Sequence, residues 1–178
     1  DVKPFAAVLT CSDAATPPEI IMDAGFGDLF VLRTPAGLAN AGEAAALEYA
    51  MADQGISLLV VMGHPDCKLV CDLLDHANLS ARMSNAADGV LTAIDRARDE
   101  FIGLQESALA TEAARLNVWQ SIERIFKFSG DIRHSVLKGK LLVMGAFYEP
   151  KTGGIEWMGR LPDERAIIKL YDTPADLQ

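Results

Sequence analysis

Long apolar runs, cysteine and positive charge are all scarce in this chain. No stretch approaches the roughly 18 consecutive apolar residues that a membrane helix needs, and residues 1–30 show no basic start followed by an apolar stretch and a cleavage site. Three cysteines argue against a disulfide framework and favour a reducing compartment, so cytoplasm is the default location, although a signal ahead of Asp1 would lie outside this sequence. With 25 acidic against 16 basic residues, the chain lacks the broad basic surface that phosphate backbones require. We therefore expect no nucleic-acid partner and no membrane partner.

Short apolar runs that alternate with helix-like segments dominate what is present. Half of the 178 residues are hydrophobic, which is enough for one well-buried domain over residues 1–178. Nearly continuous runs rich in valine and leucine are typical of parallel strands covered on both faces. Strands are predicted at residues 5–10, 28–32, 57–62 and 140–148. The predicted fold class is α/β, with a mainly parallel sheet of four to five strands flanked by helices.

Proline and glycine mark the ends of the predicted helices. A helix opens at Pro17-Pro18 and ends at Gly25 or Gly27, residues 42–54 form a second helix capped by Gly55, and a third starts near Pro65.

The second half of the chain is predicted in the same way. Residues 78–128 have no proline and no strand-like run, which predicts a helical insertion. A turn with proline and paired glycines precedes a return strand at residues 155–158, so the sheet is expected to end in an antiparallel edge. The tail after Asp172 is expected to fray.

Polar residues follow the first and third predicted strands and suggest a metal site. Cys11-Ser12-Asp13 comes after one strand, and His64-Pro65-Asp66-Cys67 comes after the other. Residues just past the carboxyl ends of parallel strands gather in one crevice. Two thiolates and one imidazole suit Zn²⁺, and three protein ligands leave a fourth position open, as in catalytic sites. The alternative is two buried thiols and a core histidine, and the ordered context favours the metal.

Five segments, taken in order, resemble a known family. They are Cys-x-Asp after the first strand, PPEIIMDAGFGDLFVLR, the Ala36-Gly37 pair, Gly-His-x-x-Cys after the third strand, and GKLLVMGAFYEPKTGGIEWMG. Over nearly the whole chain this series resembles the β-class carbonic anhydrases. The resemblance implies a parallel-centred sheet and Zn²⁺ held by Cys11, His64 and Cys67. It also implies a homodimer or higher homo-oligomer with the metal near the subunit interface, and reversible hydration of carbon dioxide to bicarbonate by zinc-bound hydroxide.

Asp13 is the candidate catalytic residue, and three roles are open to it. It can accept a hydrogen bond from the nucleophile, bind zinc as a fourth ligand, or serve as a turn carboxylate near Pro17. In the family, an arginine two residues further on holds this aspartate away from the metal, and here that position is Ala15. Without a guanidinium fork the carboxylate can swing to the cation, and a closed four-ligand zinc is usually structural.

Further departures fall around the expected substrate pocket, which we place at Ala15, Gly37 and Lys68. Lys68 stands where the family usually has glycine, and it could pair with Asp13 or attract an anion, although lysine cannot reproduce the guanidinium fork. Leu38 follows Ala36-Gly37 in place of the family's asparagine, which removes a polar side chain. Arg33 either borders the site or forms an interface salt bridge.

The remaining cysteine and histidines receive simpler interpretations. Cys71 is interpreted as a small buried hydrophobe, and His76 and His134 as surface histidines.

Two classes of function follow. The first is an enzyme acting on carbon dioxide or on a similar linear substrate such as carbonyl sulfide or carbon disulfide. The second is a catalytically silent, zinc-stabilised assembly or regulatory module, which Ala15 favours. A nucleotide-binding domain is set aside because no glycine-rich phosphate loop follows the first strand.

Overall fold

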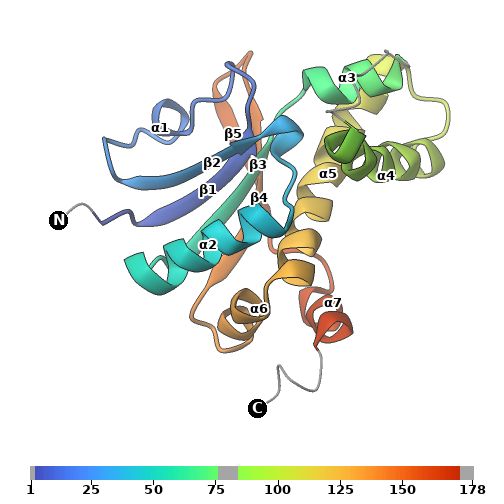
Figure 1. Cartoon of the computed structure of the whole chain (residues 1–178). Coiled ribbons are helices and arrows are strands. Elements are labelled where there is room, and N and C mark those ends of the chain that lie inside the picture. The colour runs from blue at the N-terminus through green and yellow to red at the C-terminus, as the bar shows by residue number, and fades with distance from the viewer. Residues whose placement is uncertain (1–2, 76–83, 173–178) are drawn as a thin grey trace.

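A five-stranded sheet forms the centre of the chain in a computed structural model that describes residues 3–75 and 84–172. The strands are β1 (Ala6–Cys11), β2 (Leu29–Thr34), β3 (Leu58–Gly63), β4 (Leu142–Glu149) and β5 (Gly154–Gly159). Their order is β2-β1-β3-β4-β5, with every pair parallel except β4 and β5 (Figure 1). The predicted α/β class, the parallel centre and the antiparallel edge are confirmed.

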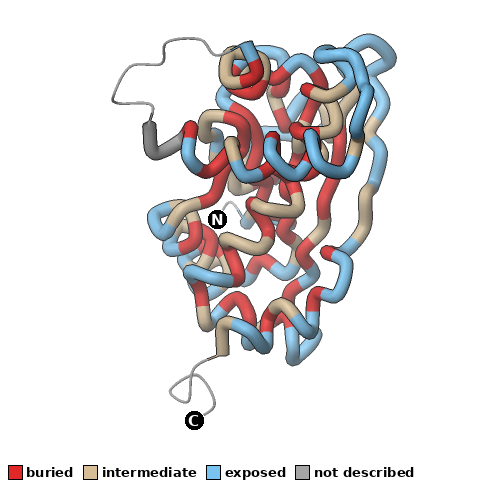
Figure 2. Tube along the Cα trace, turned by 90° about the vertical axis from the view of Figure 1, so that its right-hand side faces the viewer, coloured by how far each residue is buried: buried red, intermediate tan, exposed pale blue. Residues whose placement is uncertain are grey.

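Both faces of the central strands are buried, which explains their nearly continuous apolar sequence. All six residues of β1 are buried. Because successive side chains point to opposite faces, Leu9 joins the larger core cluster on one face and Val8 joins a smaller cluster on the other. Figure 2 shows the buried residues in red along the packed interior, with exposed residues on the outer turns. The sheet is therefore a rigid platform, and its carboxyl edge can hold side chains in fixed positions.

The first helices differ in how well sequence signals place their ends. Helix α2 (Ala41–Gln54) begins with a capping box between Asn40 and Glu43 and ends at a left-handed Gly55, as predicted. Helix α1 (Pro18–Ile21) is much shorter than predicted, because Asp23 adopts a left-handed φ of 49° and stops it before Gly25.

The third helix begins later than predicted. Helix α3 (Lys68–Leu74) starts after Cys67 rather than near Pro65, because Asp66 has a left-handed φ of 55° and Cys67 is not helical.

The segment predicted as a helical insertion is part of the core. Helices α4 (Ser84–Glu100) and α5 (Glu106–Phe128) occupy most of it, and residues 78–83 lie outside the described part of the chain. Helix α5 packs on α4, β3 and β4, with α3 near one end and α6 (Gly130–Leu137) and α7 (Glu164–Tyr171) near the other (Figure 1). The segment is helical, as predicted, and α5 covers part of the sheet.

Helix α5 approaches the sheet so closely that two strand positions must be glycine. A Cβ added at Gly63 would lie 2.7 Å from Val118 Cγ2, and one at Gly145 would lie 2.8 Å from Trp119 Cζ3. Real Cβ atoms do not tolerate such contacts, and packed interiors have little room to adjust. Gly63 is the last residue of β3, so this close approach also fixes the chain just ahead of His64.

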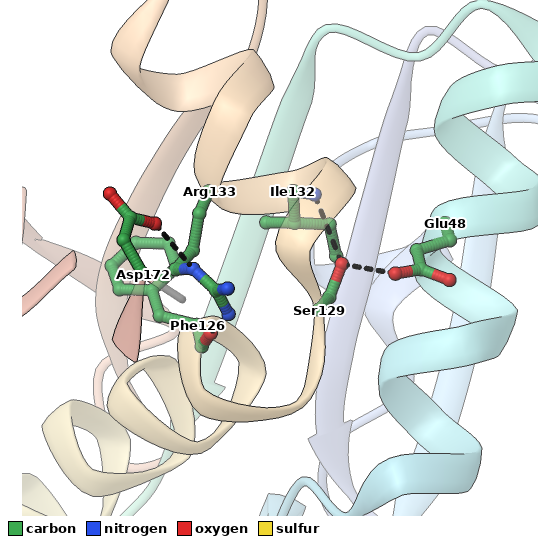
Figure 3. Close-up of polar contacts among 6 residues, drawn as sticks. All are labelled: Glu48, Phe126, Ser129, Ile132, Arg133 and Asp172. Carbon is green, nitrogen blue, oxygen red and sulfur yellow. Dashed lines mark hydrogen bonds and ion pairs between the residues drawn. The ribbon is translucent and has the colours of Figure 1, made fainter. Parts of the chain in front are cut away.

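Polar contacts join α6 to α2, to α5 and to the end of α7 (Figure 3). Ser129 caps α6 by accepting a hydrogen bond from the Ile132 N–H at 3.0 Å, and its hydroxyl donates to Glu48 of α2. The guanidinium of Arg133, only 4% exposed, pairs with Asp172 at 3.0 Å and donates to the Phe126 carbonyl at 2.6 Å. These bonds fasten the end of α7 to α6. The tail after Asp172 lies outside the described residues.

None of the helices in the described part of the chain combines the length and the apolar character needed to cross a membrane.

Candidate metal centre

Three side chains meet at the carboxyl edge of the sheet. Cys11 is the last residue of β1, His64 follows β3 directly, and Cys67 precedes α3. One donor atom from each lies within 4.8 Å of the other two. Exposed fractions of 5%, 3% and 4% show that all three residues are buried. The structure therefore brings together the three ligands predicted from the sequence.

The arrangement of these donors fits Zn²⁺. The sulfurs of Cys11 and Cys67 are 3.9 Å apart, far from a disulfide bond and close to the separation of about 3.8 Å expected for two sulfurs each about 2.3 Å from one tetrahedral zinc. His64 Nδ1 donates to the Pro65 carbonyl at 2.8 Å, while Nε2 is buried without a partner among the described residues. A ring that donates through one nitrogen presents the other as a metal ligand.

Hydrogen bonding lowers the pKa of one of the two thiols, that of Cys11. The pKa of Cys11 is lowered to about 4, chiefly because the Cys67 thiol donates a hydrogen bond to it, and the nearby His64 ring lowers it further. The same contact with Cys11, together with burial, raises the pKa of Cys67. Burial lowers the pKa of His64, but the nearby sulfur of Cys11 outweighs it, so that pKa is raised. Thiolates are the form that binds metal, so Cys11 is prepared to bind a cation.

The Asp13 carboxylate lies beside this group but outside it. Its Oδ1 accepts a hydrogen bond from the Ala15 N–H at 3.0 Å, and the Asp13 N–H donates to Cys11 Sγ at 3.4 Å. No arginine or lysine in the described chain lies within ion-pair distance of this carboxylate. Residue 15, which is arginine in the family pattern, therefore contacts the Asp13 carboxylate here through its backbone N–H.

Arg33 borders the site through main-chain contacts. It lies opposite Thr10 in the β1–β2 register, and its Nε donates to the Cys11 carbonyl at 3.1 Å while Nη2 donates to the Asp13 carbonyl. The hydroxyl of Thr16, which is fully buried, donates to the same two carbonyls at 3.1 Å each. The loop after β1 is therefore held by two donors that each bridge the same pair of carbonyls.

A tight turn, η1 (Pro35–Gly37), packs against the backbone of β1. Ala36 and Gly37 both have positive φ angles, 56° and 67°. A Cβ at Gly37 would lie 3.3 Å from the Thr10 carbonyl carbon, so this position suits glycine for both its angle and its space. The turn therefore braces β1 next to Cys11.

Helix α5 holds this turn, a role that sequence reasoning missed. Asn117 donates to the Ala36 carbonyl at 2.7 Å, Ser121 to the Gly37 carbonyl at 3.0 Å and Arg124 to the Ala39 carbonyl at 2.6 Å. The available signal was polar residues spaced four and three apart on an otherwise apolar helix face.

A hollow of about 520 Å³ opens beside the centre. Its lining is Cys11, Ser12, Asp13, Ala14, Pro35, Ala36, Lys68, Leu69 and Asp72. Of the expected pocket residues, Lys68 lines it, whereas Ala15 and Gly37 each adjoin a lining residue. Lys68 Nζ pairs with Asp72 Oδ1 at 2.8 Å, one turn along α3, rather than with Asp13.

The other cysteine and histidines take no part in the centre. Burial raises the pKa of Cys71, with neighbouring carboxylates adding to the effect, and Cys71 is not in the metal-binding group of the described residues. His134 is exposed, as predicted. His76 lies outside the described part of the chain.

Comparison with known proteins agrees with this geometry. The fold and donor set define an α/β protein with a zinc-type Cys-His-Cys centre. A family model described as carbonic anhydrase matches residues 6–155. The chain is 32% identical over 166 residues to a carbonic anhydrase of Synechococcus elongatus, covering 88% of this chain and 61% of that protein. It is 27% identical over 171 residues to carbonic anhydrase 2 of Mycobacterium tuberculosis, covering 94% of this chain and 75% of the relative.

Solved structures share the fold. A β-carbonic anhydrase of Aspergillus fumigatus superposes with a TM-score of 0.85 at 20% identity, covering 96% of this chain and 84% of that one. One of two tetrameric β-carbonic anhydrases of Sordaria macrospora gives 0.82 at 24% identity, covering 89% and 82%. The chain belongs to the β-class carbonic anhydrase family. It spans about three fifths of the length of the Synechococcus relative.

Proposed function

We propose that Cys11, His64 and Cys67 hold Zn²⁺ and that the chain catalyses the reversible hydration of carbon dioxide to bicarbonate. The observation that carries the proposal is the buried group of three donors, in which His64 Nε2 has no partner within the described residues. When bound, zinc lowers the pKa of a water molecule to near 7 and so supplies a nucleophile at neutral pH.

The residues around the centre supply binding and orientation. Ala14, Pro35, Ala36 and Leu69 give the hollow an apolar wall, which suits a small uncharged substrate. Asp13 Oδ1 is occupied by the Ala15 N–H, and no hydrogen bond from the described chain reaches Oδ2. Oδ2 is therefore available to accept a hydrogen bond from the attacking water and to orient its lone pair toward the substrate.

Metal content and ligation test the first half of the proposal. The purified chain should carry one zinc, and X-ray absorption should show two sulfur ligands and one imidazole. Cys67→Ser should lose most of the metal, whereas Cys71→Ser, one helical turn away, should keep it. Absence of sulfur ligation in the native chain would reject the centre.

A catalytically silent zinc module is the second candidate, and Ala15 is the observation that favours it. In the family pattern an arginine occupies this position, and without its guanidinium the Asp13 carboxylate is free of any ion pair within the described chain. If Asp13 became a fourth ligand, the centre would be closed and structural.

Stopped-flow hydration of carbon dioxide separates the two candidates. The native chain and Ala15→Arg should be measured with matched zinc content. Similar high rates would support the enzyme with another group in place of the arginine, and a large gain in Ala15→Arg would identify a disabled enzyme. Equal absence of turnover would favour the structural role.

We also propose a homodimer or higher homo-oligomer as the working state. Ile20 and Phe26 are 80% and 107% exposed, and they line a hollow of about 630 Å³ beside α1. Such exposed apolar side chains are typical of contact surfaces. Light scattering coupled to gel filtration should give a multiple of 19.1 kDa, and Phe26→Ser should reduce it.

A further inference from the structure

The guanidinium of Arg33 donates hydrogen bonds to two main-chain carbonyls. Within the described chain no carboxylate lies within ion-pair distance of its guanidinium, although the protein carries an excess of acidic residues. Instead Nε and Nη2 reach the carbonyls of Cys11 and Asp13, which lie on either side of Ser12. A planar guanidinium can span two acceptors in this way, whereas a lysine ammonium is a single point charge. Arg33 therefore acts as a fork across the loop after β1.

This fork opposes the movement that would close the metal centre. For the Asp13 carboxylate to reach a metal held by Cys11, its Oδ1 must leave the Ala15 N–H. The Asp13 main chain is held at its carbonyl by Arg33 and by both the N–H and the hydroxyl of Thr16. These bonds fix the main chain from which the carboxylate extends and the loop that carries the Ala15 N–H, so they favour the position in which Oδ1 stays on that N–H.

We propose that Arg33 is a positioning residue that keeps Asp13 off the metal and so keeps the remaining coordination position open to small anions. The assignment rests on the proposed zinc centre. Position 15 is alanine and offers no guanidinium, so in this proposal Arg33 of β2 holds the loop instead, through the main-chain carbonyls of Cys11 and Asp13. Access of a small anion to the metal then depends on Arg33, which does not itself contact the metal.

Thiocyanate binding to the cobalt-substituted protein tests this role. Co²⁺ in the centre gives visible bands that change when an anion enters its coordination shell, and thiolate ligation gives a separate near-ultraviolet band. Arg33→Gln should keep the near-ultraviolet band while its thiocyanate Kd rises about tenfold, the change expected if only one molecule in ten remains open. Arg33→Lys should show a similar loss, because it keeps the charge but loses the fork.

The second substitution Asp13→Asn isolates the cause. In the Arg33→Gln background it should restore thiocyanate binding, because an amide is a poor metal ligand and cannot close the centre. Arg98→Gln, which removes an exposed arginine on α4, is the matched control and should behave as the native chain.

Several outcomes would overturn the role of Arg33. They are an unchanged Kd in Arg33→Gln, a normal Kd in Arg33→Lys (which would indicate simple charge attraction), and failure of Asp13→Asn to restore binding. A native protein that shows the thiolate band but binds no thiocyanate would also overturn it, while the metal centre would stand. A native protein without that band would remove the proposed function as well. If Arg33→Gln does not fold, Arg33→Lys and Thr16→Val give the same comparison.

Discussion

The loop after β1 and the loop after β3 deliver donors to one centre but are held by different forces. The first is held by hydrogen bonds, with Arg33 and Thr16 both donating to the carbonyls of Cys11 and Asp13. The second leaves the sheet at Gly63, where Val118 and Phe147 leave no space for a methyl group. Hydrogen bonds can be exchanged one partner at a time, whereas packing at this density tolerates little change. The polar loop is therefore where the chain has room to depart from its family.

The packed loop should give the largest response to a small change. In Gly63→Ala the new methyl would lie 2.7 Å from Val118 Cγ2, and the stiff valine cannot move aside cheaply. We expect a loss of about 2–3 kcal/mol in the free energy of unfolding, measured by urea titration, together with weaker zinc binding. Gly42→Ala, which meets no atom within 4 Å, is the control. Equal stability of the two variants would show that the loop after β3 is not held by packing.

Removing one hydrogen-bond donor from the polar loop should have a smaller effect. Thr16→Val keeps the shape of a fully buried side chain but removes the hydroxyl that donates to the Cys11 and Asp13 carbonyls. The expected cost is about 1–2 kcal/mol, measured by guanidinium unfolding. Thr111→Val, whose hydroxyl bonds within α5 on the solvent side, should change little. A cost above that of Gly63→Ala would reverse the comparison.

A change at the turn η1 should lower stability less than either of these two substitutions. Ser121→Ala removes the donor to the Gly37 carbonyl and leaves that acceptor buried, which should lower stability by about 1 kcal/mol. Thermal unfolding with and without zinc is the measurement. We expect a larger drop in the midpoint with zinc than without it, because the turn braces the backbone beside Cys11. An identical drop in both states would place Ser121 outside the support of the centre.

The smallest effect is expected at Lys68. Its side chain is 80% exposed and pairs with Asp72 at the surface, so Lys68→Gln should leave the free energy of unfolding nearly unchanged. Zinc affinity and thiocyanate affinity, both read by titration, should stay the same. A marked loss of thiocyanate binding would instead make Lys68 the cation that compensates for Ala15.

Much of the fold follows directly from the sequence. The four parallel strands are short apolar runs, of which β1 is buried on both faces. Gly55 ends α2 because glycine accepts the left-handed conformation there. Helix α1 was predicted too long because Asp23 adopts a left-handed conformation that a sequence pattern does not distinguish from a continuing turn. The three metal donors were predictable because the carboxyl ends of parallel strands converge.

The support of the centre was much harder to predict. Arg33 could be placed near the site by its position after β2, but its main-chain acceptors depend on the strand register and the loop path. Asn117 and Ser121 lie more than eighty residues from their partners in η1. Contacts of this kind join segments brought together only by the complete fold, and no local pattern specifies them.

Helix α5 contacts η1 beside the metal centre, strands β3 and β4 of the sheet, and helices α6 and α7. Local opening of the metal edge would have to pull on the same helix that covers the sheet, so the two regions form one cooperative unit. Backbone amides near the metal edge and near α6 and α7 are then expected to be protected from hydrogen exchange together, and metal occupancy is expected to add to the protection of strands that never contact the ion.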